Sequence, residues 1–264
     1  MNGDAIELSI IAPAFLAGVI VLLTHIPLGA LVLKRGIVFI DLAIAQIAAL
    51  GVILAGIADL EHAWAMQLCA GLAAVLGAFL LTWTEKRWPD VQEAQIGVLF
   101  VLAATGSLLL LAHNPHGGEH LRDLLAGQIL WVRYDQLLIP AIATVVIALL
   151  VFRRPLAGVG FYLVFALAIT ISVQLVGVYL VFASLIIPSL GVRSYPARRR
   201  LPLAYAVGIC GYAMGLVLSL VFDLPSGALI VWMLALLAIP THAVGARRHR
   251  VPKPAKVVAG AFDH

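Results

Sequence analysis

Polar side chains are rare in this sequence, yet several lie inside long apolar segments. His25 lies in LLTHIPLG, and Asp41 and Gln46 lie in FIDLAIAQIAALG. Such side chains are costly at membrane depth, so we interpret them as candidates for function. A neutral imidazole and a carboxylate are ligands for a borderline divalent cation such as zinc or manganese, and a glutamine oxygen is a weaker, harder donor. Alternatively, His25 and Gln46 only hydrogen-bond to a neighbouring helix, and Asp41 pairs with Lys34 or Arg35.

A second group of potential ligands lies in the hydrophilic segment AHNPHGGEHLRDLLAGQ at residues 112–128. It contains His113, His116, Glu119 and His120. A proline and two glycines among them are incompatible with the zinc-binding helix of a metalloprotease. We expect a loop that captures a cation loosely at the mouth of a path. The alternative is a solvated surface loop without a ligand.

The composition excludes an ordinary soluble domain. Of the 264 residues, 63% are hydrophobic and only 11% are charged, which is too few to cover a soluble surface. Several apolar runs reach the roughly 20 residues that cross a bilayer core, and they do not alternate with polar residues. The sequence therefore predicts an all-α, polytopic protein in a lipid bilayer, with about eight or nine transmembrane helices.

One membrane domain is expected over residues 1–245, followed by a basic tail at 246–264. Between 156 and 192 only two short spans fit, so we expect a break near Gln174 to Gly177 or at Pro188, which makes one span short or broken. The expected spans are 8–33, 37–57, 63–84, 94–112, 136–152, 156–174, 176–192, 201–222 and 226–243.

Basic residues gather in five clusters, at 33–36, 85–88, 152–155, 193–200 and 246–256. Each cluster adjoins an apolar span, which fits the positive-inside rule and not nucleic-acid binding. An even number of spans separates neighbouring clusters, so all five are expected on the cytoplasmic side. The N-terminus and the loop 113–120 are then outside, and the C-terminus is in the cytoplasm.

His25 and Gln46 are expected at the same depth. Each lies about nine or ten residues from the cytoplasmic end of its span, or roughly 13–15 Å, which is close to the bilayer midplane. The two spans are adjacent and antiparallel. The sequence therefore predicts that the imidazole and the amide meet at a midplane site, with Asp41 about one turn nearer the cytoplasm.

No enzymatic constellation is present in the sequence. No serine has a histidine and an aspartate at a usable spacing, and the nucleotide-binding pattern G-x-x-x-x-G-K-[ST] does not occur. We therefore predict that the chain is not an enzyme and does not itself hydrolyse ATP.

Five blocks of the sequence resemble the permease subunit of metal-ion ABC transporters, the family that imports zinc, manganese or iron in bacteria. The resemblance implies a protein of the bacterial cytoplasmic (inner) membrane that works as a homodimer with a cytoplasmic ABC ATPase and an extracytoplasmic metal-binding protein. It implies a divalent metal cation, zinc or manganese, as transported substrate, and no permanently bound cofactor. The blocks are residues 28–55, 93–111, 124–132, 175–189 and 218–231.

Two departures from the family pattern stand out. The family's second span reads Asp-x-x-x-His, but here Asp41 is followed four residues later by Ala45; in an alternative register Gln46 takes the histidine position and Leu42 the aspartate position. His25 is then expected to compensate for the absent histidine.

The second departure is the short segment 152–163, where the family carries a cytoplasmic coupling helix for the ATPase. We expect the ATPase contact to be reduced or to have moved to RSYPARRR or EKRWPDVQEAQ. The predicted function is an ATP-driven metal importer, and the alternative is an ATP-independent facilitator or secondary carrier of the same fold.

The outer loop yields a first prediction. Replacing His113, His116 and His120 together with Ala should raise the external metal concentration needed for half-maximal uptake, because the loop no longer concentrates cations. Maximal uptake should change little, since the path itself is intact. Initial uptake rates measured over a range of metal concentrations test this, and an unchanged half-saturating concentration would exclude a capture role.

Overall fold

The computed structural model describes residues 3–58, 60, 62–111, 129–153 and 158–248. They form an all-helical protein, which confirms the predicted fold class. The helices are α1 (Gly3–Arg35), α2 (Ile40–Ile57), α3 (Ala63–Arg87), η1 (Pro89–Val91), α4 (Gln92–Leu111), η2 (Ile129–Trp131), α6 (Tyr134–Arg153), α7 (Gly158–Val176), α8 (Val178–Gly191), α9 (Ala197–Phe222) and α10 (Ser226–Arg248).

Eight of the helices in the described ranges are long and apolar enough to cross a membrane. The exception is α8, which has 14 residues and so extends only about 21 Å. This agrees with the expected eight or nine spans including a short one.

The break between α7 and α8 falls at Gly177, within the expected region. Its backbone has φ 79° and ψ 163°, a conformation that residues with a Cβ atom rarely adopt. The other expected position was Pro188, which instead lies inside α8. The chain therefore reverses direction at Gly177.

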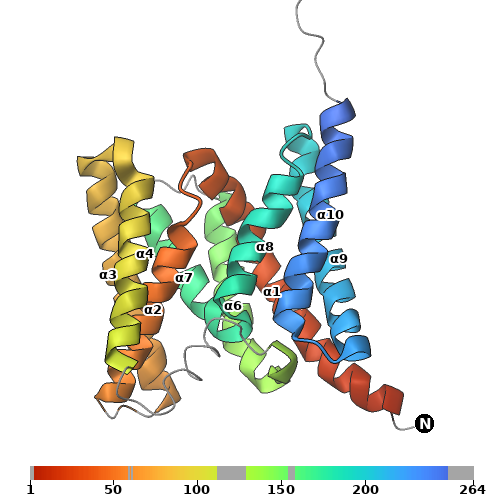
Figure 1. The fold of residues 1–264 in the computed structure, drawn as a ribbon, viewed down its shortest axis with the longest axis horizontal. Coiled ribbons are helices and arrows are strands. Elements are labelled where there is room, and N and C mark those ends of the chain that lie inside the picture. Colours follow the sequence, from red (N-terminus) through yellow and green to blue (C-terminus); the bar gives the residue numbers. More distant parts are fainter. Residues whose placement is uncertain (1–2, 59, 61, 112–128, 154–157, 249–264) are drawn as a thin grey trace, which may run out of the picture.

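The helices form two groups joined by α7 and α8 (Figure 1). On one side α2 packs against α3 and α4, and on the other α9 packs against α10. Helix α1 packs mainly against α8 and α9, and α7 packs mainly against α3. The labels in Figure 1 place α7 and α8 between α2 and α1.

Helix α8 is attached to its neighbours by polar contacts as well as by apolar packing. The Ser189 hydroxyl donates to the Ile26 carbonyl oxygen of α1 at 3.2 Å. The Tyr212 hydroxyl of α9 lies 2.7 Å from the Ser184 hydroxyl oxygen, and Ser184 donates to the Leu180 carbonyl oxygen. All three side chains are buried. These contacts fix α8 against α1 and α9.

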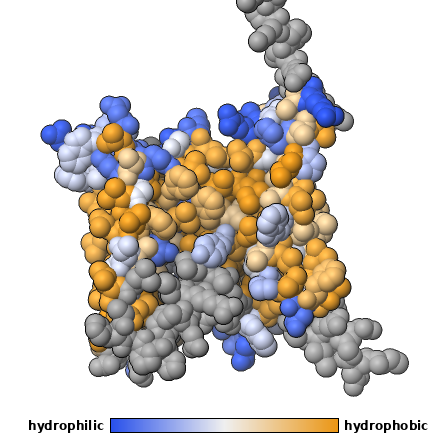
Figure 2. Space-filling model, in the orientation of Figure 1, coloured by the Kyte–Doolittle hydropathy of each residue, from blue (hydrophilic) through white to orange (hydrophobic). Residues whose placement is uncertain are grey.

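The basic helix ends lie together on one side of the molecule. This was expected because an even number of spans separates neighbouring basic clusters. Lys34, Phe152 and Arg200 line one pocket, which brings together ends of α1, α6 and α9. Arg35 of α1 lies 3.8 Å from Glu85 of α3, and the Tyr195 hydroxyl donates to the Thr241 carbonyl oxygen of α10. Figure 2 shows hydrophilic residues along this edge and a broad hydrophobic band below it.

Close packing between α1 and α8 depends on Gly29. A Cβ atom at this position would overlap the Leu185 carbonyl group. Because the obstacle is backbone, Gly29→Ala should lower the free energy of unfolding by about 1–3 kcal/mol. The measurement is the melting temperature of the purified protein in detergent.

A matched control is Gly97→Ala in α4, where a Cβ atom would meet nothing within 4 Å. This variant should melt at or above the wild-type temperature, because alanine is favoured over glycine inside a helix. Equal melting temperatures for the two variants would contradict the close approach of α1 and α8.

Candidate functional site

A cavity of about 650 Å³ lies between α2, α4, α8 and α10. Its lining is apolar except for Gln46, Tyr179 and Trp232. Gln46 is 4% exposed, whereas Tyr179 and Trp232 are 58% and 66% exposed. The cavity therefore joins a buried amide to the outer surface of the helix bundle.

Gln46 is the buried polar group of this cavity. Its side-chain oxygen has no hydrogen-bond partner within the described ranges. An unsatisfied amide in apolar surroundings is costly, and because residue 46 lines the cavity, a ligand that enters the cavity lies beside this amide. Polar side chains kept at membrane depth in this way mark ion and substrate paths.

His25 is fully buried in α1 and does not line this cavity. Its Nδ1 lies 2.9 Å from the Val21 carbonyl oxygen. Since a carbonyl only accepts, Nδ1 carries the proton and Nε2 bears the lone pair. Nε2 has no hydrogen-bond partner among the residues the structure places. The imidazole is thus held in a form that binds a metal, but at a distance from the cavity.

The expected pairing of His25 with Gln46 is wrong. The two residues lie on α1 and α2, which follow each other in sequence but do not pack side by side. Helices α7 and α8 lie between them instead (Figure 1). Equal depth in the membrane therefore does not bring the two side chains together. Within the described residues no group of three His, Cys, Asp or Glu side chains is placed to hold a metal ion.

Asp41 lies in the first turn of α2 and is 1% exposed. Its carboxylate lies near the backbone N–H groups of Asp41 and Leu42, and no side chain in the described part of the chain forms a hydrogen bond with it. Glu93 at the start of α4 is close enough to act on it electrostatically, and accepts a hydrogen bond from the Phe39 backbone N–H at 3.3 Å. Asp41 does not line the cavity, so it lies beside the path and not in it.

The sequence alone did not assign three further residues to this region. Tyr179 and Trp232 lie within the expected spans 176–192 and 226–243, and only the tertiary structure places them beside Gln46. Glu93 lies five residues after the basic cluster at 85–88, which was the available signal for a carboxylate at a helix start. The expected outer ligands His113, His116, Glu119 and His120 lie outside the described residues, and their role stays a prediction.

Comparison with known proteins identifies the class. The model of the ABC 3 transport family matches residues 7–161 and 154–245. The chain therefore belongs to the ABC 3 transport family, which confirms the resemblance to metal-ion ABC permeases found in its sequence.

Two relatives and one solved structure are similar over most of the chain. A probable iron transport system membrane protein of Haemophilus influenzae is 27% identical, over 63% of this chain and 72% of the relative. The manganese transport system membrane protein MntC of Halalkalibacterium halodurans is 27% identical, over 77% and 76%. The structure of PsaBC from Streptococcus pneumoniae in complex with Fab has a TM-score of 0.73 at 19% identity, over 94% and 98%. This last likeness shows that the fold is shared.

The different positions of Gln46 and His25 are open to a direct test. In a background with Cys69 and Cys210 replaced by Ala, Gln46→Cys should react with a small methanethiosulfonate reagent, because residue 46 lines a cavity. His25→Cys should stay unmodified, because residue 25 is enclosed between helices. Mass spectrometry of the intact protein measures the modification, and equal labelling of both cysteines would contradict the geometry described.

Proposed function

We propose that this chain is the permease subunit of an ATP-driven importer of a divalent metal cation. Membership of the ABC 3 transport family and the names of its iron and manganese relatives support a metal transport role. The observation that carries the proposal is the unpartnered Gln46 oxygen in a cavity among membrane helices. The membrane is the bacterial cytoplasmic membrane, with the N-terminus outside and the basic helix ends and C-terminus inside.

Among divalent cations, the site favours manganese or ferrous iron over zinc. The cavity offers the Gln46 amide oxygen, and the Asp41 carboxylate lies beside the path, nearer the side of the basic helix ends. Oxygen ligands suit manganese, whereas zinc is typically held by nitrogen and sulfur ligands. Since His25 does not line the cavity, its imidazole is not among these ligands.

A second copy of the chain would complete the path. The cavity opens on a face where Tyr179 and Trp232 are exposed. One amide oxygen is too few ligands for a divalent cation. A homodimer related by a two-fold axis at this face would supply Gln46 twice and enclose the cavity, around which access alternates between the two sides.

The proposed ATPase contact is the connection between α3 and α4. The segment 152–163, where the resemblance implies a coupling helix, is short in this sequence. By contrast, the α3–α4 connection contains η1 and exposes Trp88 and Val91. Its base is fixed by Gln92, whose amide donates to the Leu81 carbonyl and to the Tyr162 hydroxyl of α7. A rigidly anchored, exposed element is suited to transmit a movement to several helices.

One observation favours a second function, that of an ATP-independent facilitator or secondary carrier. The segment 152–163 is short where the resemblance to metal-ion permeases implies a coupling helix for the ATPase. If the α3–α4 connection does not bind an ATPase, the cavity still offers a path for a cation along its gradient.

Substitution of Gln46 tests the importer and its metal. Gln46→Leu should reduce manganese uptake at least tenfold, because it removes the oxygen ligand and keeps the side-chain volume. Gln46→His should retain transport and shift preference toward zinc, because imidazole is a better zinc ligand. Uptake of each metal is measured by inductively coupled plasma mass spectrometry in a strain that lacks its own importers.

The controls separate the two functions. Thr105→Val, in α4 and outside the cavity lining, should leave uptake unchanged. Uptake is then measured with the co-expressed ATPase subunit in intact and hydrolysis-deficient forms. Loss of uptake with the deficient ATPase supports the importer, and undiminished uptake supports the facilitator. Normal uptake by Gln46→Leu would refute the proposed site in both cases.

A further inference from the structure

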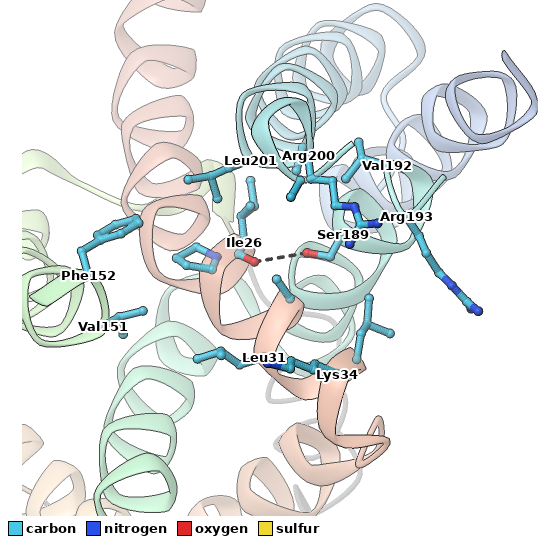
Figure 3. Close-up of a pocket in the computed structure, with 15 residues that line it drawn as sticks. Ile26, Leu31, Lys34, Val151, Phe152, Ser189, Val192, Arg193, Arg200 and Leu201 are labelled. Carbon is cyan, nitrogen blue, oxygen red and sulfur yellow. Dashed lines mark hydrogen bonds between the residues drawn. The ribbon is translucent and has the colours of Figure 1, made fainter. Parts of the chain in front are cut away.

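A second space, separate from the Gln46 cavity, lies over α1 between α6 and α9. Both α6 and α9 pack against α1 but hardly against each other. This leaves a groove of about 590 Å³, which shares no lining residue with the Gln46 cavity. Figure 3 shows Val151 and Phe152 of α6 and Leu201 of α9 turned toward this groove.

Polarity changes along the groove. Its mouth, at the basic end of the molecule, carries Lys34, Arg193 and Arg200, whereas its inner part is formed by apolar residues such as Ile26 and Ala30. From Lys34 to Ile26 the groove follows α1 for about 12 Å. Such a gradient matches an amphiphile whose head group lies at the membrane surface and whose chain lies in the hydrocarbon.

Among the described residues, the basic side chains at the mouth of the groove have no acidic partner. No aspartate or glutamate lines the groove, and the ion pairs found among described residues involve none of these three side chains. Arg200 is oriented by the hydrogen bond from its Nε to the Tyr195 carbonyl oxygen at 2.7 Å. In Figure 3 the Arg200 side chain extends over the groove near Ser189, whereas the Arg193 side chain extends away from the groove. Lys34 and Arg200 are therefore the cations that can meet an anion in the groove.

We propose that this groove binds one anionic phospholipid from the membrane leaflet on the basic side. An acyl chain lies along α1 between α6 and α9, and the phosphate lies between Lys34 and Arg200. Phe152 is 58% exposed at the groove's edge, so the groove is open to the surrounding lipid and a phospholipid can enter from the side. Basic pockets between helices at the cytoplasmic surface have the chemistry that recognises anionic head groups. The site is independent of the identity of the transported ion.

Native mass spectrometry of the purified full-length chain tests this proposal. Phosphatidylglycerol and phosphatidylcholine with the same acyl chains are added to delipidated protein, and the affinity of the first bound lipid is measured. Wild type should prefer phosphatidylglycerol. Lys34→Ala together with Arg200→Ala should weaken phosphatidylglycerol binding by about 30-fold, or about fivefold for each charge, and leave phosphatidylcholine binding unchanged.

The matched control replaces Arg198 and Arg199 with Ala. These residues belong to the same turn of α9 and carry the same charge, but do not line the groove. Their double variant should bind phosphatidylglycerol within twofold of wild type. Equal loss in both double variants, or equal affinity of wild type for the two lipids, would overturn the proposal.

Two alanine-to-phenylalanine variants, one inside the groove and one outside it, test where the acyl chain binds. Ala30 is exposed and lines the groove, so Ala30→Phe should fill it and weaken binding of both lipids. Ala206 is also exposed but does not line the groove, so Ala206→Phe should have no effect. Glycerol phosphate in excess should fail to displace the lipid. Displacement would show a site for free phosphate instead and would refute a phospholipid site.

Discussion

The short helix α8 is the constraint on which the arrangement of this protein depends. With 14 residues it is shorter than the roughly 30 Å hydrocarbon core of a bilayer. A helix of this length is tolerated where protein covers its ends. Here α1, α9 and α10 surround it, and the Ser189 and Tyr212 hydrogen bonds attach it to two of them. Its position between α1 and α2 determines which polar groups can meet.

The same requirement for satisfied backbone groups governs the helix interiors. Pro27 lacks an N–H, so the Leu23 carbonyl oxygen has no donor within α1. The Tyr205 hydroxyl of α9 donates to that oxygen at 3.1 Å. In a membrane such a compensation must come from a neighbouring helix or from trapped water. Packing of α9 on α1 therefore depends on the proline as well as on apolar contact.

Polar groups thus divide into those that hold helices together and those left unpartnered. The hydroxyls of Ser184 and Ser189 belong to the first kind, and the Gln46 oxygen belongs to the second. Only an unpartnered group that faces a cavity offers a ligand position, which is why Gln46 and not His25 carries the proposed function. At the surface, the lipid groove combines an apolar space with two cations that have no acidic partner in the part of the chain that the structure describes.

The sequence by itself determined the membrane class, the number of spans, the break near Gly177 and the common side of the basic clusters. These features depend on length, local composition and backbone chemistry, which act within a few turns of chain. It also singled out Gln46. The tertiary structure alone decided that α7 and α8 separate α1 from α2, so that His25 and Gln46 do not meet, and that Tyr179 and Trp232 lie beside Gln46. Which helices pack side by side depends on contacts such as Gly29 against Leu185, and these join positions far apart in the chain.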